Sequence, residues 1–360
     1  MDKKYMERAI SLAKGGIGFV NPNPLVGAVI VKEGKIIGEG FHEHYGELHA
    51  ERNALKKCTE SAQGAEMYVT LEPCCHYGKN PPCTEAVIAS GIKKVYVGSS
   101  DPNPLVAGGG IKQLRDAGIE VVENVMKDEC DALNDIFFHF ITANRPYVIM
   151  KAAISADGKI ACGNGASRWV TNELSRAHTH ELRKRVSAIM VGVNTVIADD
   201  PMLNCRCENP SNPVRVICDT NLRTPLESHI VKTANEIPTW IFTSCIDEEK
   251  AQEYKRYGVN IICTPKDKNG HVSLEYICRY LGENKIDSLL IEGGAKIHSA
   301  ALQSGIVNKA QFYIAPKIIG GDGMNSVAEM GIESMDDAVM LKNPKVRTFG
   351  EDVMIEYEVK

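Results

Sequence analysis

Short apolar runs alternate with amphipathic segments along the first third of the chain. The runs predict strands over 25–31, 67–71, 95–98 and 120–123, and the amphipathic segments predict helices over 49–58, 84–90 and 108–117. Regular alternation of this kind is typical of a mainly parallel sheet with helices on both faces.

A longer amphipathic segment follows, over 127–143, and its apolar side chains share one side, which predicts a single helix. The segment ends before Asn144-Arg145-Pro146. Because the residue before a proline disfavours the helical conformation, we expect a domain boundary here. The predicted domains are 1–145 and 146–360.

A second alternation begins at Tyr147, and its pattern again favours an α/β domain. Its strand-like segments cover 147–155, 188–192, 213–219, 239–244, 259–264, 288–294, 310–321 and 351–359.

Composition narrows the classes of function. The chain has 360 residues and a net charge of -5, which argues against a nucleic-acid or anionic-membrane surface as partner. No run of eighteen apolar residues occurs, so no membrane span is expected, and the first sixteen residues favour an amphipathic helix over a signal peptide. The twelve cysteines are typical of buried reduced thiols, which predicts a cytoplasmic protein.

The stretch LEPCCHYGKNPPCTEAV, residues 71–87, holds three cysteines and a histidine, and His49-Ala50-Glu51 lies upstream at the start of a predicted helix. One histidine and two thiolates supply three zinc ligands and leave a fourth position for water, as in catalytic zinc sites. Glu51 is placed to transfer protons between water and a leaving amine. His-x-Glu followed by Pro-Cys and a second cysteine is the signature of zinc nucleobase deaminases.

Cys74 and Cys75 compete for one ligand position. Adjacent side chains diverge by about 100° or more in a turn or helix start, so both rarely bind one ion. Pro73 is typical of a first helical turn and predicts that Cys74 lies at a helix N-terminus, where a thiolate is favoured. A structural zinc site or three buried thiols are the alternatives; Glu51 and the count of three ligands favour catalysis.

The loop CCHYGKNPPC, with His49-Ala50-Glu51 before it, resembles the deaminase domain of the bifunctional riboflavin-biosynthesis deaminase/reductase family. The resemblance implies that the first and last cysteines of the loop, Cys74 and Cys83, bind Zn²⁺ with His49, and that Cys75 only packs. It also implies a substrate pocket lined by Asn23, His42, His76 and Lys79.

The second half lacks a GxGxxG motif, so a Rossmann dinucleotide site is not expected. Gly293-Gly294 instead follows an apolar strand and precedes a helix, where backbone N–H groups can approach an anion. Further polar clusters fall at the ends of predicted elements, where α/β sites form. They are 151–159, 167–171, 192–195 and 199–201 with Arg206.

These clusters resemble the reductase domain of the same family, whose fold is that of dihydrofolate reductase. The resemblance implies NADPH contacts from Ala153, Trp169, Thr195, Asp199, Gly294, Ala295 and Lys296. It implies substrate contacts from Ser167, Arg183, Leu203, Arg206 and Glu292. Arg183 and Arg206 suit a bidentate grip on a sugar phosphate, and Lys151 suits polarisation or protonation beside the carbon that receives hydride.

The expected protein is an α/β enzyme with a cytidine-deaminase-like α/β/α domain followed by a dihydrofolate-reductase-like domain. Its expected substrate is a pyrimidine ribotide, deaminated with zinc and then reduced with NADPH, and we expect a homo-oligomer. Two alternatives remain. One is a cytidine- or adenosine-type deaminase of nucleosides or RNA with a vestigial second domain, and the other is a zinc-stabilised interaction module.

Overall fold

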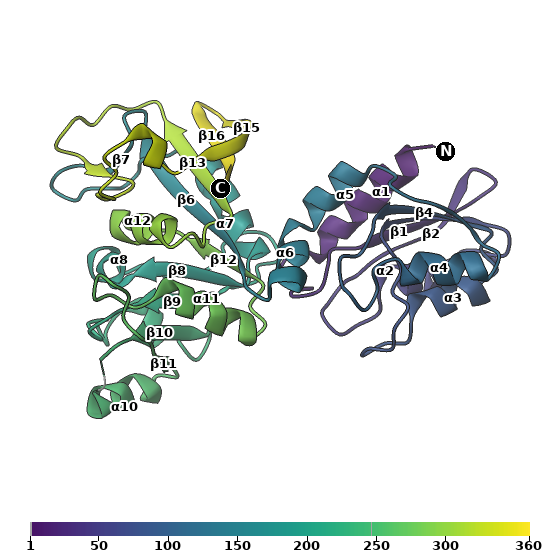
Figure 1. The fold of residues 1–360 in the computed structure, drawn as a ribbon, viewed down its shortest axis with the longest axis horizontal. Coiled ribbons are helices and arrows are strands. Elements are labelled where there is room, and N and C mark those ends of the chain that lie inside the picture. Colours follow the sequence, from purple (N-terminus) through teal and green to yellow (C-terminus); the bar gives the residue numbers. More distant parts are fainter. Residues whose placement is uncertain (1, 246) are drawn as a thin grey trace. The chain divides into compact units, whose positions relative to one another are not determined.

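The computed structural model describes residues 2–245 and 247–360. The chain forms two compact units, Met1–Asn144 and Arg145–Lys360 (Figure 1). Within the described residues, no helix combines the length and the apolar character needed to cross a membrane.

The first unit is a five-stranded sheet between two helical layers, counted over its described residues. Its strands, in the order β2-β1-β3-β4-β5, are β1 (Gly27–Lys32), β2 (Lys35–Phe41), β3 (Glu66–Leu71), β4 (Lys94–Ser99) and β5 (Glu120–Val122). Its helices are α1 (Lys4–Ala13), the 3₁₀ turn η1 (Lys14–Gly16), α2 (Ala50–Lys56), α3 (Cys83–Ala89), α4 (Gly109–Asp116), α5 (Lys127–Leu133) and α6 (Asp135–Ala143).

The two-residue period of the strands explains the layers. Ala28 and Ile30 of β1 face a core shared with α2, α3 and α4, whereas Val29 and Val31 face α1 and α5. Figure 1 shows these helices on opposite sides of the sheet. Both faces of β1 are therefore buried, which is why its sequence is almost continuously apolar.

The expectation of a mainly parallel sheet is right for β3, β4 and β5 and wrong for β1. β1 runs antiparallel to both β2 and β3. The cause is a tight hairpin at Glu33-Gly34, where both residues have positive φ, 50° and 77°. β2 was not predicted, because its first residues are exposed and two glycines interrupt its apolar pattern.

The segment 127–143 is two helices, so the prediction of one helix is wrong. The break is at Asn134, whose buried side chain is both acceptor and donor in hydrogen bonds with the backbone of Leu25. Its Oδ1 accepts from the Leu25 N–H at 2.8 Å and its Nδ2 donates to the Leu25 carbonyl at 3.0 Å. A contact with a residue so far away in sequence cannot be read from helical periodicity.

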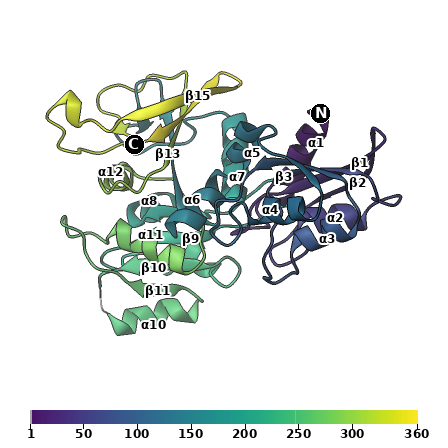
Figure 2. The ribbon, with the colours of Figure 1, turned by 45° about the vertical axis from the view of Figure 1, so that its right-hand side comes forward.

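The second unit is built on a nine-stranded sheet, counted over its described residues, in the order β11-β10-β9-β8-β12-β6-β13-β16-β15 (Figure 1). Figure 2 shows β9, β10 and β11 of this sheet from a second direction. Its strands are β6 (Tyr147–Ser155), β7 (Lys159–Ala161), β8 (Ala188–Gly192), β9 (Val214–Cys218), β10 (Thr239–Thr243), β11 (Asn260–Cys263), β12 (Ser288–Ile291), β13 (Lys309–Ala315), β14 (Met324–Asn325), β15 (Leu341–Phe349) and β16 (Asp352–Val359). β7 and β14 pair with each other, apart from the large sheet. Its helices are α7 (Glu173–Arg185), α8 (Val193–Asp199), α9 (His229–Lys232), α10 (Glu248–Arg256), α11 (Leu274–Glu283), α12 (Ala295–Gln303) and the 3₁₀ turn η2 (Met335–Asp337).

The strands from β11 to β13 are parallel, and β16 and β15 add an antiparallel edge. Helices α8, α9 and α10 cover one face of the parallel part and α11 and α12 the other. Such a sheet puts the segments that follow its parallel strands along one edge, where α/β proteins bind ligands.

Most strands of this unit were predicted within a residue or two, but two differences matter. β13 ends at Ala315, before Pro316, whereas the prediction extended to 321. β15 was missed because seven of its nine residues are exposed, so it shows no apolar alternation.

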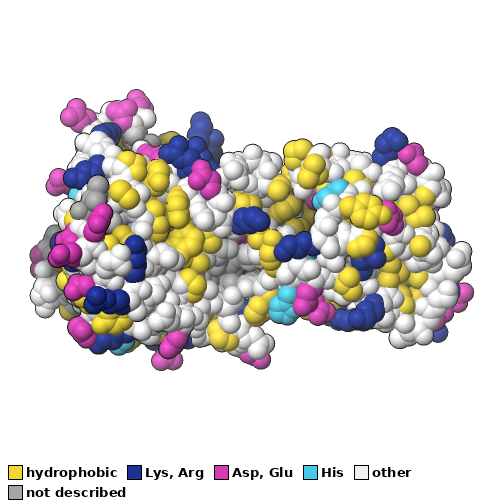
Figure 3. All heavy atoms as spheres, turned by 90° about the horizontal axis from the view of Figure 1, so that it is seen from below, with side chains coloured by type: hydrophobic (Ala, Val, Ile, Leu, Met, Phe, Trp, Pro, Cys, Tyr) yellow, Lys and Arg dark blue, Asp and Glu magenta, His cyan; other side chains and the backbone are white. Residues whose placement is uncertain are grey.

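Acidic and basic side chains are interspersed with apolar ones over the face of the molecule shown in Figure 3. This mixture agrees with the small negative net charge of the chain.

The Asn134 contact generates a prediction about stability. Asn134→Ala removes the partner of the N–H and carbonyl of the half-buried Leu25, and each lost partner costs about 1–3 kcal/mol. Denaturant unfolding should therefore show a loss of roughly 2–4 kcal/mol for the first unit. The exposed Thr142→Ala, on α6, should change stability by no more than about 0.5 kcal/mol. Equal stability of the two variants would contradict the role given to Asn134.

Candidate functional site

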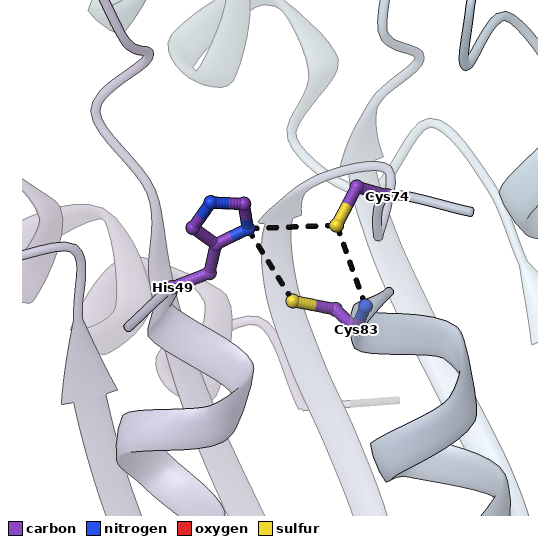
Figure 4. Close-up of side chains that lie close together, drawn as sticks. All are labelled: His49, Cys74 and Cys83. Carbon is purple, nitrogen blue, oxygen red and sulfur yellow. Dashed lines mark hydrogen bonds between the residues drawn. The ribbon is translucent and has the colours of Figure 1, made fainter. Parts of the chain in front are cut away.

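Three side chains from separate elements of the first unit converge on one point (Figure 4). His49 is the residue before α2, Cys74 lies in the segment that follows β3, and Cys83 is the first residue of α3. The Nδ1 atom of His49 lies 3.5 Å from the Sγ of Cys74 and 3.5 Å from the Sγ of Cys83. All three donor atoms lie within 4.8 Å of one another.

This spacing fits a tetrahedral zinc ion. With Zn–S near 2.3 Å and Zn–N near 2.0–2.1 Å, a tetrahedral nitrogen and sulfur lie about 3.5 Å apart. One imidazole and two thiols also match the donor types that zinc prefers, and three protein ligands leave one position open. The residues present therefore fit a catalytic zinc ion.

Cys75 lies outside this group. Its thiol donates to the carbonyl of Leu105 at 3.8 Å. The prediction that Pro73 starts a helix at Cys74 is wrong, since residues 72–75 have no regular structure. The cysteine at a helix N-terminus is Cys83, preceded by Pro82.

The polar surroundings favour a thiolate at Cys74. The backbone N–H of Cys83 donates to the Cys74 sulfur at 3.3 Å. The hydrogen bond with the Cys83 thiol, followed by that with His49, lowers the pKa of Cys74 to about 4. A metal ligand needs this deprotonated form.

Glu51 lies in the first turn of α2, two residues after His49, and its side chain is 3% exposed. Burial, and then the charge of Cys74, raise the pKa of the Glu51 carboxyl. A carboxyl whose pKa is raised toward neutrality can both accept and return a proton at working pH. The environment of Glu51 therefore suits acid–base work.

His42 and Asn23 form a second polar pair beside the metal-binding group. The His42 Nδ1 donates to the carbonyl of Leu48 at 3.1 Å, and its Nε2 lies 3.1 Å from the Asn23 amide nitrogen. Burial lowers the pKa of His42, so the ring is neutral and its Nε2 accepts from Asn23. The His42 ring meets His49 edge-on with centroids 5.3 Å apart. This arrangement orients the Asn23 amide, which leaves the amide oxygen as an acceptor.

His76 and Lys79 lie on the loop that carries the cysteines. The His76 Nδ1 is buried without a hydrogen-bond partner among the described residues. The Lys79 ammonium is exposed and lies 4.0 Å from the centre of the Tyr45 ring. Both groups remain available to a ligand.

Sequence reasoning missed Glu72, which shapes this region. Its buried carboxylate accepts from the backbone N–H groups of Gly108 at 3.0 Å and Ile111 at 3.1 Å. It thereby anchors the segment that leads into α4, next to Asp101, whose pKa is raised by burial to about 6. The available signal was an acidic residue directly after a buried strand.

In the second unit, Lys151, Arg183 and Glu292 come together from β6, α7 and the end of β12. Arg183 makes a bidentate ion pair with Glu292 at 2.6 and 2.9 Å, and its Nη1 donates to the Asn204 carbonyl at 2.9 Å. Burial, and then the charge of Arg183, lower the pKa of Lys151, although Glu292 opposes them. A lysine of lowered pKa can deliver a proton more readily.

The structure changes the role expected for Arg183. The edge of its guanidinium that was to grip a phosphate is occupied by Glu292. Arg206 is exposed, and its contacts are with His180, which lies 3.2 Å from Nη2. Of the two arginines, Arg206 is thus the one with a side chain open to a ligand.

The residues expected at the cofactor lie along the edge where the parallel strands end. Gly294, with φ of 79°, precedes α12, whose first residues are Ala295 and Lys296. The Thr195 hydroxyl lies 3.4 Å from the position that a Cβ on Gly293 would take. A Cβ at this turn would thus be in ordinary van der Waals contact with Thr195.

The remaining expected contacts are spread around the same edge. Trp169 is 60% exposed, and the Arg176 guanidinium lies 4.6 Å from its ring centre. Leu203 is buried with φ of 48°, Ala153 is half-buried in β6, Ser167 is half-exposed, and Asp199 is exposed at the end of α8.

Comparison with known proteins agrees with both units. Residues 1–99 match the cytidine and deoxycytidylate deaminase zinc-binding region, and residues 146–355 match the RibD C-terminal domain. A riboflavin biosynthesis protein RibD of Actinobacillus pleuropneumoniae is 54% identical over 99% of this chain and 95% of its own length.

Two solved structures extend this likeness to the whole fold. The RibD of Acinetobacter baumannii aligns with a TM-score of 0.88 at 36% identity, covering 99% of this chain and 98% of that one. A diaminohydroxyphosphoribosylaminopyrimidine deaminase/5-amino-6-(5-phosphoribosylamino)uracil reductase of Thermotoga maritima aligns with a TM-score of 0.88 at 39% identity and the same coverage.

Fold and site together define a zinc-binding deaminase domain of the cytidine-deaminase type joined to a reductase domain like dihydrofolate reductase, which confirms the predicted fold class. The chain belongs to the riboflavin biosynthesis protein RibD family. It is accordingly a bifunctional enzyme of riboflavin biosynthesis, with a hydrolytic deaminase and an oxidoreductase activity.

The geometry of the metal-binding group predicts the effect of each cysteine on metal content. The purified protein should hold about one zinc per chain, and Cys83→Ser should lose most of it because two ligands hold zinc poorly. Cys75→Ser is the matched control and should keep its zinc, since that thiol contacts Leu105 instead. Elemental analysis of the folded variants checks this. Zinc lost from Cys75→Ser but kept in Cys83→Ser would overturn the ligand set.

Proposed function

We propose that the first unit deaminates 2,5-diamino-6-ribosylamino-4(3H)-pyrimidinone 5′-phosphate and that the second unit reduces the ribosyl side chain of the product to ribityl with NADPH. The observation that carries the proposal is the tetrahedral spacing of His49, Cys74 and Cys83 beside the buried Glu51. The activity named for the Thermotoga maritima relative supports this substrate.

In the deaminase unit we assign the metal to His49, Cys74 and Cys83, and the proton transfers to Glu51. Zinc, when bound, supplies Lewis-acid activation of the attacking water. Glu51 takes one proton from that water and passes it to the ring nitrogen. It then takes the remaining hydroxyl proton from the tetrahedral adduct and delivers it to the amino group, which leaves as ammonia. The raised pKa of Glu51 supports this role because the carboxyl must hold the proton between the two transfers.

Substrate binding in this unit is assigned to Asn23, His42, His76 and Lys79. The fixed amide of Asn23 offers an acceptor for a ring amino group, with His42 as its support. The unpartnered His76 Nδ1 offers a polar contact. Lys79, exposed above Tyr45, is suited to the ribosyl or phosphate end.

In the reductase unit, NADPH supplies a hydride to C1′ of the ribosyl group. Opening the sugar breaks the C1′–O4′ bond and requires a proton on O4′, which we assign to Lys151. Its lowered pKa makes the ammonium a better proton donor. The Arg183–Glu292 pair holds the carboxylate of Glu292 in place near Lys151, so that Glu292 helps to position the ammonium that burial acidifies.

The other substrate contacts and the cofactor contacts are assigned to residues along the same edge of the sheet. Arg206 receives the substrate phosphate, with Ser167 and Leu203 lining the site. The cofactor is assigned to Ala153, Trp169, Thr195, Asp199, Gly294, Ala295 and Lys296. The residues at the N-terminus of α12 would hold its pyrophosphate, because backbone N–H groups and Gly294 allow close approach there. We expect NADPH to be preferred over NADH.

Two independent sites predict separable effects of mutation. Glu51→Gln keeps the size of the side chain but cannot carry the proton, so deamination should fall by about 10²- to 10⁴-fold. The same variant should reduce the deaminated compound at nearly the wild-type rate. Lys151→Ala should do the reverse and lose reduction by about 10²-fold or more.

Assays of each half-reaction on purified, zinc-loaded protein measure these rates. Glu129→Gln, an exposed change on α5, is the matched control for Glu51→Gln and should leave both rates unchanged. Loss of both activities in a folded Glu51→Gln protein would refute two independent sites.

We also infer a homo-oligomer and a cytoplasmic location. All twelve cysteines are free thiols, which supports a reducing compartment. β15 is the last strand of the large sheet, so its outer edge offers backbone groups for pairing. Val346 on β15 is 62% exposed, and Met335 and Met340 just before it are 85% and 57% exposed. An exposed edge with apolar side chains fits a second copy of the chain.

Val346→Asp places a charge on this edge and should shift the protein toward monomers in light scattering after size-exclusion chromatography. Ile36→Asp, the same kind of change at an exposed residue of β2, should leave the mass unchanged. An unaltered mass for Val346→Asp would rule out β15 as the contact.

A further inference from the structure

Two cysteines flank Arg206 in the segment between α8 and β9, residues 200–213. Their Sγ atoms lie 3.1 Å apart, although no bond joins them and both are free thiols. Cys205 is 4% exposed and Cys207 is half-buried, whereas Arg206 between them is exposed. As in an extended strand, this alternation puts the two sulfurs on one side of the backbone and the guanidinium on the other.

Hydrogen bonds hold the two sulfurs in contact. The Cys205 thiol donates to the carbonyl of His180 on α7 at 3.3 Å, so the proton between the two sulfurs comes from Cys207. The backbone N–H of Cys205 donates to the Oδ1 of Asn212 at 2.9 Å, which fixes the backbone as well. The two thiols are therefore positioned to react with each other.

Arg206 contacts the same histidine. Its backbone N–H donates to the Nδ1 of His180 at 3.2 Å, and its Nη2 lies 3.2 Å from the Nε2 of that ring. The position of the guanidinium thus depends on the backbone that the two cysteines hold on either side. A change in the bonding between the two sulfurs acts directly on Arg206.

Closing a disulfide here needs only a small movement. Since an S–S bond is about 2.05 Å long, the two sulfurs have to approach by about 1 Å from their present contact. The bond closes a small ring that contains the backbone of Arg206, so that backbone takes up part of the movement. Arg206 then loses its present alignment with His180.

We propose that Cys205 and Cys207 are an oxidative modification site: a hydroperoxide converts the pair to a disulfide, which displaces Arg206 and weakens substrate binding in the second unit. This inference rests on the proposed role of Arg206 in binding the substrate phosphate. A displacement of about 1 Å in a group that positions a substrate costs up to about 100-fold in activity. The deaminase site shares none of these residues, so the disulfide affects reduction and spares deamination.

The reaction balances with hydrogen peroxide as the oxidant. One sulfur attacks a peroxide oxygen and breaks the O–O bond, which gives a sulfenic acid and one water. The second sulfur attacks the sulfenic sulfur, so that the S–S bond forms, the S–O bond breaks and the hydroxyl leaves with the second thiol proton as water. Two electrons pass from sulfur to oxygen. A dithiol reverses the change by exchange, in which it becomes a disulfide and the two protein thiols are regained.

The environment of the pair keeps it reduced at rest. Burial, and then the neighbouring Cys205, raise the pKa of the Cys207 thiol to about 12, so Cys207 stays protonated at neutral pH. Because the thiolate is the reactive form, a protonated Cys207 slows oxidation until peroxide is abundant. The site therefore responds to oxidative stress.

The test treats the full-length, zinc-loaded protein with increasing concentrations of hydrogen peroxide. Mass spectrometry, after alkylation of the remaining thiols, should find Cys205 and Cys207 unalkylated and joined within one peptide. The KM of the second unit for the deaminated ribotide should rise by about 10- to 100-fold in step with this disulfide. Dithiothreitol should restore the original KM.

Three variants assign the effect. Cys207→Ser is close to cysteine in size but cannot form the bond, so peroxide should leave its KM unchanged. Cys162→Ser removes an exposed thiol elsewhere in the same unit and should respond to peroxide as the wild type does. Arg206→Gln has a raised KM from the start, and oxidation of the pair should add little to it.

If peroxide oxidises other thiols and leaves Cys205 and Cys207 open to alkylation, the modification site is refuted and the proposed function stands. A disulfide that forms without a change in KM, or an equal rise of KM in Cys207→Ser, overturns its effect on Arg206. A reduced protein that does not turn over the ribotide with NADPH refutes the proposed function, whereas mass spectrometry still reports the disulfide by itself.

Discussion

The deaminase unit is organised around one geometric constraint: an imidazole nitrogen lies 3.5 Å from each of two sulfurs, and all three atoms lie within 4.8 Å of one another. Three separate stretches of backbone must meet this constraint together: the start of α2, the irregular segment after β3 and the start of α3. A small shift of any of these backbone segments would move a ligand atom by a distance comparable with the length of a metal–ligand bond. The tightly packed sheet below, with both faces buried, supplies the necessary rigidity.

The reductase unit is organised around an ion pair. Its central cluster is held by the ion pair between Arg183 and Glu292, residues on α7 and at the end of β12. A buried pair of this kind is useful less for its net stability than for the fixed position it gives each partner. Burial is the main cause of the lowered pKa of Lys151, and the two charges of the pair act on that pKa in opposite directions.

Local sequence patterns predicted many of the helices and strands. Residues 147–155 and 188–192 are strands as predicted, because buried parallel strands are continuously apolar. β15 is exposed and polar, and it exists because β16 offers it a partner. The ligand residues could be named from motif and resemblance, since HAE and the cysteine loop lie close together in sequence. The pairing of Arg183 with Glu292, and the break at Asn134, depend on residues more than a hundred positions away, which no local pattern reports.

The bond between Asn134 and Leu25 also constrains the order in which the chain can mature during synthesis. His49, Cys74 and Cys83 are all made early, and a metal-binding group of three can assemble once α3 has formed. The loop that bears Asn23 is different: it adjoins Leu25, whose backbone is satisfied only when Asn134 arrives, 109 residues later. Since domains fold as units during translation, the loop beside Asn23 is secured only after the chain has been synthesised as far as Asn134, when the three ligands are already present.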